Sequence, residues 1–291
     1  MLDAVFGNEM EWRVTAFGSS ARRASLRSGR SIDVLPIQEI AHCRAASAYI
    51  FHYAYLGKEM VTAYGTKRFI AVNEALSDLV AGFCERMTSG GLFFASSGAA
   101  YYAAGSEDDP TRQVYGVSKV RDEGRFLGMG SENFHVCACR IFNMAGPFIN
   151  KLSEYALSSI LLDVQRGGPI RLRAQKPVVR SFVHVRDIVD VVLGLLLEGS
   201  APSVPFDAAG PEPIEIGDLA ARAAKALGLA NARIERLPIT SRVEDRYVGD
   251  AGTFQSLMER LGVEPAGLDM QIRDTAHYLA SLLSEDVLSA D

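Results

Sequence analysis

Short runs of β-branched and aromatic residues alternate with longer helical patterns, and this alternation is the feature that most constrains the fold. The runs predict strands at residues 13–17, 32–37, 48–53, 92–95 and 134–142. Helical patterns over residues 69–87 and 117–127 lie between the later strands. Because neighbouring parallel strands need a crossover connection, usually a helix, we predict an α/β fold with a doubly wound parallel sheet covered on both faces.

The pattern of predicted strands and helices changes after Gly146-Pro147. Beyond this point the pattern predicts a helix at about 153–165, a short basic strand at 170–173, a strand and helix at 181–185 and 188–197, and a second clear helix at 216–227. Asp218 in the first turn and Gly228 after the last turn are typical helix boundaries. We therefore predict two domains, residues 1–147 and a smaller C-terminal lobe at 148–291, with about 181–210 returning to the sheet.

The composition argues against several classes of protein. A formal net charge of −5, with no run of Lys and Arg, does not suit sequence-independent binding of nucleic acid, which needs a basic surface. No segment reaches the roughly 18 consecutive apolar residues of a membrane span, and no secretory signal is expected. Four cysteines without a C-x-x-C pair suit a reduced, cytoplasmic protein. The most basic stretch, from Arg22-Arg23 through Arg27 to Arg30, is interpreted as a solvated loop.

Tyr115 and Lys119 are four residues apart, so on a helix they share one face. A phenol has a pKa of about 10, and an adjacent cation stabilises the phenolate and lowers this pKa. Such a tyrosine can exchange a proton with a substrate hydroxyl while a hydride moves to or from a nicotinamide ring. On spacing alone, the alternative is a helix start that carries an exposed lysine.

Three other segments place polar or small residues beside predicted strands. Ser96-Ser97-Gly98 follow the strand at 92–95, and Asn143 with Gly146-Pro147 follows the run that ends near residue 142. Ligands of doubly wound sheets bind beyond the carboxyl ends of the strands, so these residues are candidates for one site. Arg180 precedes an alternating strand, and arginine suits bidentate phosphate binding. The alternatives are strand-ending turns and a surface ion pair.

Together these motifs resemble the extended short-chain dehydrogenase/reductase family, specifically its NAD-dependent sugar-nucleotide epimerases and dehydratases. The motifs occur in the order Ser-Ser-Gly at 96–98, Tyr-x-x-x-Lys at 115–119, Arg-x-x-Asn-x-x-Gly-Pro at 140–147 and Arg-x-Phe-Val-His-Val-x-Asp at 180–187. The resemblance runs from about residue 13 to the C-terminus. It implies a Rossmann-type dinucleotide-binding domain at 1–147, a substrate-binding lobe at 148–291, a nucleotide-sugar substrate and a homodimer.

The resemblance also implies roles for individual residues. Tyr115 would be the acid/base, Lys119 would lower its pKa and hold the nicotinamide ribose, and Ser97 would bind the reacting oxygen. The residues expected to contact the cofactor are His52, Ala54, Ser96, Tyr115, Lys119 and Phe142. The residues expected to hold the substrate and its diphosphate are Gly98, Asn143, Arg180 and Arg242. No metal site is expected, and His52 is interpreted as structural rather than catalytic.

The chain departs from the family pattern at its start. The family opens with a strand and a G-x-x-G-x-x-G turn that cradles the cofactor pyrophosphate, and no such turn is found. Gly18-Ser-Ser ends what aligns as the second strand, so the first strand and its turn, about 15–20 residues, are expected to precede this sequence. The second strand also lacks its usual acidic end. The expected cofactor is NAD. Arg22 and Arg23 lie nearby and could suit a 2′-phosphate, so NADP is possible.

The residues after Ser97 bear on the reaction. Dehydratases of this family usually place Asp-Glu or Glu directly after the catalytic hydroxyl residue, whereas Gly98-Ala99 stand here. The resemblance therefore favours 4-epimerisation or 4-keto-sugar reduction over the alternative, 4,6-dehydration. A reductase of small carbonyl compounds is a rival enzyme. An alternative of another class is a catalytically silent binding protein that has lost its cofactor.

Overall fold

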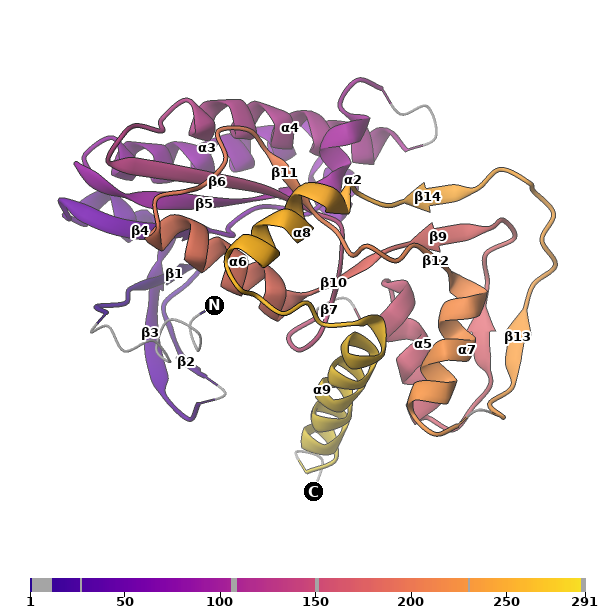
Figure 1. Cartoon of the computed structure of the whole chain (residues 1–291). Helices are drawn as coiled ribbons and strands as arrows, with labels where there is room; N and C mark the ends of the chain where they lie inside the picture. The colour runs from indigo at the N-terminus through magenta and orange to yellow at the C-terminus, as the bar shows by residue number, and fades with distance from the viewer. Residues whose placement is uncertain (2–11, 27, 106–108, 150–151, 230, 289–291) are drawn as a thin grey trace. The chain divides into compact units, whose positions relative to one another are not determined.

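The computed structural model describes residues 1, 12–26, 28–105, 109–149, 152–229 and 231–288, with side chains in the last helix up to residue 283 (Figure 1). The chain divides into two compact units. Unit 1 comprises Met1–Arg140 and Val192–Phe206, and unit 2 comprises Ile141–Val191 and Asp207–Asp291. The α/β class is confirmed, because parallel strands alternate with helices that flank them. The domain boundary at residue 147 stays a prediction.

The main sheet of unit 1 has the strand order β11-β6-β5-β4. Its members are β4 (Ser47–His52), β5 (Ser89–Ser97), β6 (Phe134–Ile141) and β11 (Phe206–Ala208), of which β11 only begins in this unit. β4 and β5 pair in parallel, from Ser47 opposite Ser89 to His52 opposite Phe94. Leu92, Phe93 and Phe94 are all buried, as expected of a strand covered on both faces.

A second, three-stranded sheet of unit 1 has the order β1-β3-β2. β1 (Ala16–Gly18) and β3 (Ser31–Pro36) pair in parallel, whereas β2 (Arg22–Ser25) pairs with β3 in antiparallel register. The interpretation of Arg22 and Arg23 as part of a loop is therefore wrong. An edge strand needs only backbone hydrogen bonds on one side and can leave charged side chains in water. Arg27, in the same basic stretch, lies outside the described residues.

The two sheets of unit 1 are separate, and each has an edge strand at one end. Among the described strands, β1 ends one sheet and β4 ends the other, and neither pairs with the other. Both are therefore edge strands within the part of the chain that the structure describes.

Helices α3 (Thr66–Cys84) and α4 (Pro110–Leu127) lie along one face of the main sheet (Figure 1). The short helices η1 (Ile37–His42), α2 (Glu59–Tyr64) and η2 (Gly98–Tyr102) occupy three of the connections. α4 begins seven residues before the predicted 117–127 helix, because Asp109 caps it and accepts a 3.0 Å hydrogen bond from the Arg112 N–H. Pro110 suits the first position of such a helix. Tyr115 therefore lies in the second turn of α4 rather than at its start.

The described residues of unit 2 form three small sheets. β7 (Asn143–Ala145) pairs in parallel with β10 (Phe182–His184), and β8 (Ile170–Leu172) with β13 (Ile234–Arg236). β9 (Val178–Arg180) lies between β12 (Ile214–Glu215), which is antiparallel to it, and β14 (Asp245–Tyr247), which is parallel.

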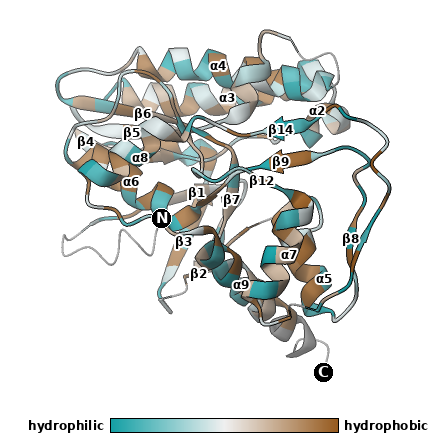
Figure 2. Cartoon of the chain, turned by 45° about the vertical axis from the view of Figure 1, so that its right-hand side comes forward, coloured by the Kyte–Doolittle hydropathy of each residue, from teal (hydrophilic) through white to brown (hydrophobic). Residues whose placement is uncertain are grey.

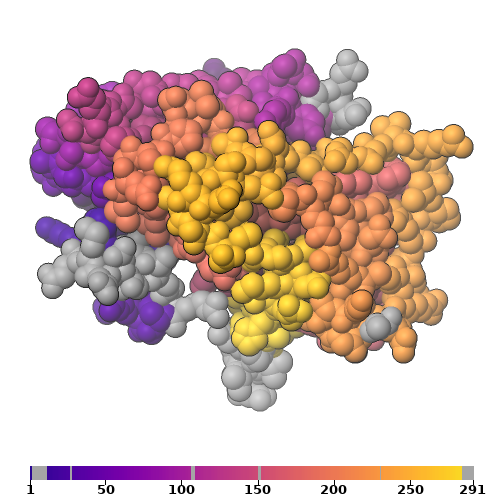
Figure 3. Space-filling model, in the orientation of Figure 1, coloured from indigo at the N-terminus to yellow at the C-terminus, as the bar shows by residue number. Residues whose placement is uncertain are grey.

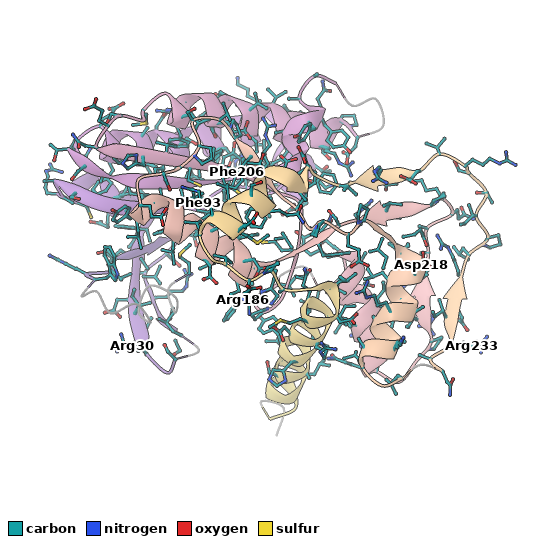
Figure 4. The ribbon with its side chains drawn as sticks, viewed as in Figure 1. Arg30, Phe93, Arg186, Phe206, Asp218 and Arg233 are labelled. Atoms are coloured by element: carbon teal, nitrogen blue, oxygen red, sulfur yellow. The ribbon has the colours of Figure 1, made fainter. Side chains whose placement is uncertain are left out.

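The helices of unit 2 supply its core. They are α5 (Ala156–Gln165), the start of α6 (Val185–Leu197), α7 (Ile216–Ala226), α8 (Ala251–Arg260) and α9 (Leu268–Leu288). α5, α7 and α9 share one buried apolar cluster that includes Leu161, Leu219 and Ile272. α7 shows a hydrophilic and a hydrophobic side (Figure 2), and Asp218 lies in its first turn (Figure 4).

Glu215, at the start of α7, joins three elements of unit 2. Its carboxylate accepts hydrogen bonds from the Gly217 N–H at 2.6 Å and from the Arg236 guanidinium at 2.7 and 2.8 Å. It also accepts one from the Val178 N–H at 3.3 Å. The Arg236 hydrogen bonds are the main cause that lowers the pKa of Glu215 to about 2.

We expect Glu215→Gln to lower the free energy of unfolding at pH 7 by about 2 kcal/mol, since hydrogen bonds to charged groups are lost. A carboxyl with a lowered pKa stabilises the fold above its unfolded pKa and loses that contribution as pH falls towards its folded pKa. The difference in the free energy of unfolding between wild type and variant should therefore decrease as the pH falls from about 4.5 to about 2. Denaturant unfolding at pH 7, 4 and 3 measures it, and a difference independent of pH would contradict this account.

Candidate active site

Tyr115 and Lys119 lie on consecutive turns of α4 in unit 1. The Lys119 Nζ lies 5.6 Å from the centroid of the Tyr115 ring. The Tyr115 ring is half-buried and contacts the rings of Tyr55 and Phe69, with centroids 6.0 and 6.4 Å away. The structure thus brings the phenol and the ammonium to one face of the helix, which the four-residue spacing predicts.

Lys119 is a buried cation with an unusual environment. Only 3% of the residue is exposed, and its Nζ donates a 2.8 Å hydrogen bond to the Ala95 carbonyl at the end of β5. The same atom lies 3.5 Å from the centroid of the Tyr55 ring and 4.7 Å from that of Phe94. Burial lowers the pKa of Lys119 to about 7, while Asp122 and Glu123 oppose that decrease.

Ser97 ends β5 and caps the following helix, η2. Its Oγ accepts a 3.2 Å hydrogen bond from the Ala99 N–H, and Gly98 is buried at the start of the turn. η2 packs directly against α4 at Gly116, where an added Cβ would lie 2.2 Å from the Ala99 carbonyl oxygen. Only glycine permits that approach. This close packing holds the end of β5 next to the turn of α4 that carries Tyr115.

Ser96 has a different partner from the expected cofactor. Its hydroxyl lies 2.5 Å from the Glu123 carboxylate, which also accepts two hydrogen bonds from Arg140, at 2.8 and 2.7 Å. Glu123 is 3% exposed, and its hydrogen bonds raise the pKa of Arg140. The Arg140 guanidinium also lies over the Tyr101 ring, 5.0 Å from its centroid. This bidentate ion pair connects α4 to β6. Through Ser96, the same carboxylate also contacts the end of β5.

Asp122 forms a second buried carboxylate site on the same helix. It is fully buried and accepts hydrogen bonds from the Tyr55 hydroxyl at 2.9 Å, the Ser77 hydroxyl at 3.0 Å and the Arg121 Nε at 2.9 Å. Burial and Asp122 raise the pKa of Tyr55, so its phenol stays protonated and donates. Sequence reasoning missed Tyr55, Asp122 and Glu123. The signal for the two acids was their spacing of three and four residues from Lys119.

His52 and Ala54, both expected near the cofactor, lie at and just beyond the end of β4. His52 is 4% exposed, stacks on Phe94 and contacts the edge of Phe126. Burial, and secondarily the charge of Lys119, lower the pKa of His52 to about 3. The ring is therefore neutral at physiological pH and packs in the core. Ala54 is half-buried and directly precedes Tyr55.

Four predicted residues belong to unit 2, and three of them contact the same strand, β14. The Asn143 amide donates to the carbonyls of Ser181, at 3.1 Å, and Tyr247, at 3.2 Å. Arg180 donates to the Asp245 carbonyl at 2.7 Å and forms an ion pair with its carboxylate at 3.2 Å. Arg180 thus has a carboxylate partner within unit 2, and both residues anchor the segment that begins at β14.

Phe142 also contacts β14, whereas Arg242 lies apart from this strand. The Phe142 ring packs against Tyr247, with centroids 4.8 Å apart. Arg242 is exposed, in the connection between β13 and β14. Residues 237–240 and 242–244 of this connection are all exposed and form part of the surface of unit 2 (Figure 3).

Among the described residues, no group of three or more His, Cys, Asp and Glu side chains is placed to bind a metal ion. Within the same residues, no helix combines the length and apolar character needed to cross a membrane.

Comparisons with known proteins identify the family and the fold of the chain. A family model described as the NAD dependent epimerase/dehydratase family matches residues 7–207. Searching the curated proteins finds no significant match. Among solved structures, UDP-glucose 4-epimerase from Thermotoga maritima with UDP-glucose is similar at a TM-score of 0.70 and 18% identity, covering 97% of this chain and 94% of that one.

Two further solved structures have the same fold at similar identity. UDP-N-acetylglucosamine 4-epimerase from Methanobrevibacter ruminantium has a TM-score of 0.64 and 18% identity, covering 86% of this chain and 84% of that one. TunA, an NAD dependent NDP-hexosamine 5,6-dehydratase, has a TM-score of 0.63 and 17% identity, covering 88% and 85%. At these identities the likeness establishes the fold, which is the Rossmann-type α/β fold predicted from the sequence.

Proposed function

Because the chain belongs to the NAD dependent epimerase/dehydratase family, we propose that it is an enzyme that interconverts the C4 epimers of a nucleotide sugar. Ser97, Tyr115 and Lys119 are the proposed catalytic residues. The observation that carries the proposal is the buried Lys119 ammonium, 5.6 Å from the Tyr115 ring centroid, on the helix that packs against the turn after Ser97. An ionisable pair of this kind is the arrangement that proton transfer at a hydroxyl requires.

Each of the three side chains has a defined part in this reaction. The Tyr115 Oη takes the proton of the C4 hydroxyl during oxidation and returns it during reduction. The Lys119 ammonium favours the phenolate form of Tyr115, because an adjacent positive charge lowers the pKa of a phenol. The Ser97 Oγ donates a hydrogen bond to the reacting oxygen and so holds it at Tyr115. When bound, NAD accepts and returns the hydride.

The residues of unit 1 fit the nicotinamide end of this cofactor. Lys119 uses one of its three ammonium hydrogens on the Ala95 carbonyl, so it has further donors for ribose hydroxyls. His52 Nε2, at the end of β4, is a buried polar atom that has no hydrogen-bond partner among the residues that the structure describes. The Ser96 hydroxyl, by contrast, is held by Glu123. The proposal therefore assigns Tyr115 and Lys119, rather than Ser96, to the cofactor.

The turn after Ser97 favours epimerisation over 4,6-dehydration. Gly98 and Ala99 are both buried there, and neither carries a carboxylate that could remove a proton from the sugar at C5. The sugar is therefore oxidised and reduced at the same carbon. In unit 1, we propose that Gly98 contacts the sugar. In unit 2, we propose that Asn143 and Arg242 contact the sugar or its diphosphate, together with Arg180 once it parts from Asp245.

The test uses the full chain with UDP-glucose or UDP-galactose and added NAD, and proton NMR follows the anomeric signals. We expect either sugar to convert to the same equilibrium mixture without net consumption of NAD. Consumption of NADPH with a 4-keto sugar, and no epimerisation, would instead identify a reductase. Absence of both activities, with no NAD binding by calorimetry, would identify a silent binding protein.

Two further properties are proposed with the function. We infer a homodimer from the family resemblance, which sedimentation equilibrium tests directly. We also infer a cytoplasmic location, which is supported by the state of the cysteines: Cys43, Cys84, Cys137 and Cys139 are all free.

A further inference from the structure

We propose that Tyr55 is a positioning residue of this site, whose ring holds the Lys119 ammonium against Tyr115 and keeps it charged. The inference rests on the proposed function, since it concerns the lysine on which that function depends. It starts from the shortest ring contact of Lys119: the Nζ lies 3.5 Å from the Tyr55 centroid, compared with 4.7 Å for Phe94 and 5.6 Å for Tyr115.

A buried ammonium needs compensation for the water that it loses. Lys119 is 3% exposed and donates one hydrogen bond to the Ala95 carbonyl. The faces of aromatic rings add to the negative charges of Asp122 and Glu123, and a cation over such a face is attracted most strongly where water is excluded. Three rings thus form an incomplete aromatic cage around the Nζ, and Tyr55 is the wall nearest to the charge.

The position of the Tyr55 ring is itself fixed. Its hydroxyl donates a 2.9 Å hydrogen bond to Asp122, a fully buried carboxylate that also accepts from Ser77. On its other side the ring contacts Tyr115 edge-on, with centroids 6.0 Å apart. Tyr55 therefore touches both members of the proposed acid/base pair while its hydroxyl is directed at neither.

Several ionisable groups surround Lys119 and, together with the Tyr55 ring, influence its pKa. They are Asp122, Glu123 and Tyr115 on α4, His52 at the end of β4, Tyr55 just after it, and Arg140 on β6, which neutralises Glu123. Asp122 and Glu123 favour the charged lysine, and burial opposes it. A cation–π contact also favours the charged form, so loss of the ring should lower the pKa of Lys119.

The experiment measures the charge of Lys119 directly, by carbon NMR of the full chain labelled at the lysine Cε atoms. The chain has six lysines, and the signal lost in Lys119→Met identifies Lys119. Tyr55→Met fills similar space without a ring, Tyr55→Leu serves if that variant does not fold, and Tyr55→Phe keeps the ring but loses the bond to Asp122. Phe51→Leu is the matched control, because Phe51 lies on β4, four residues before Tyr55, and its ring contacts Phe93 on the neighbouring strand β5.

We expect Tyr55→Met to lower the titration midpoint of Lys119 by about one pH unit. Tyr55→Phe should stay within a few tenths of a unit of the wild type, and Phe51→Leu should leave the midpoint unchanged. The alkaline limb of kcat should move to lower pH by the same amount in Tyr55→Met alone. A midpoint that does not fall in Tyr55→Met, or that falls equally in Tyr55→Phe, would overturn the proposed role of the ring.

The two readouts separate this inference from the proposed function. The NMR midpoint needs no substrate and no turnover, so it tests the ring even if the enzyme has another activity. If the midpoint falls as expected but no variant and no wild-type protein epimerises a nucleotide sugar, the proposed function fails while the contact stands. If the wild type epimerises and the midpoint does not change, the inference alone fails.

Discussion

Tyr115→Phe is expected to reduce epimerase turnover by about 10²–10⁴-fold, the range typical of losing a positioned acid/base group. The substitution removes one oxygen atom and keeps the ring that packs between Tyr55 and Phe69. The fold and the binding of NAD should therefore be retained. Steady-state kinetics of the purified variant, with thermal melts and cofactor titration alongside, measure this effect.

The control for this variant is Tyr64→Phe in α2. That tyrosine is 40% exposed and stacks under the Arg68 guanidinium, so loss of its hydroxyl should leave turnover within about twofold of the wild type. Turnover in Tyr115→Phe equal to that of Tyr64→Phe would refute the acid/base role of Tyr115. A loss accompanied by a lower melting temperature would show structural damage instead.

The second large effect is expected at Glu123. Glu123→Gln keeps the shape of the side chain but leaves the Arg140 guanidinium without its bidentate carboxylate. Breaking a buried pair in this way costs about 3 kcal/mol or more, because one charge remains uncompensated. We therefore expect the free energy of unfolding of unit 1 to fall by about that amount, measured by denaturant unfolding followed by circular dichroism.

Two comparison variants test whether loss of the buried ion pair causes the decrease in the free energy of unfolding. Glu74→Gln makes the same change at an ion pair with Arg121, where Glu74 has a side chain 49% exposed, and should cost less than about 1 kcal/mol. The double variant Glu123→Leu with Arg140→Met removes both charges and should regain more than half of the loss. Equal losses in Glu123→Gln and Glu74→Gln would mean that the buried pair contributes no more than an exposed one.

Much of the fold follows from periodicity and turn residues in the sequence. The strands at 134–142 and 48–53 and the helix at 216–227 differ from β6, β4 and α7 by one residue or so at their ends. Their boundaries carry strong local signals, such as Asp218 early in α7 and Gly228 after it. Short strands without such signals, including β2, β9 and β14, were not predicted, because backbone pairing with a distant strand defines them.

The candidate site likewise combines features that are visible in the local sequence with contacts that form only in the folded protein. The spacing of Tyr115 and Lys119 within one helix is visible in the sequence, and so is the end of β5 at Ser97. The ring of Tyr55 reaches Lys119 from 64 positions earlier in the chain, and Arg140 reaches Glu123 from 17 positions later. These contacts form only when β4, β6 and α4 pack together, so no local sequence pattern predicts them.

The ionic contacts of the α4 carboxylates have a consequence for how such an enzyme can diversify. Every hydrogen-bond partner shown for Asp122 and Glu123, namely Tyr55, Ser77, Ser96, Arg121 and Arg140, belongs to unit 1. Asn143 and Arg180 make theirs within unit 2. Under the proposed function, substitutions in unit 2 that alter substrate choice would therefore leave the charged groups around Lys119 undisturbed. The bound sugar could then change during evolution while the proposed proton transfer stays the same.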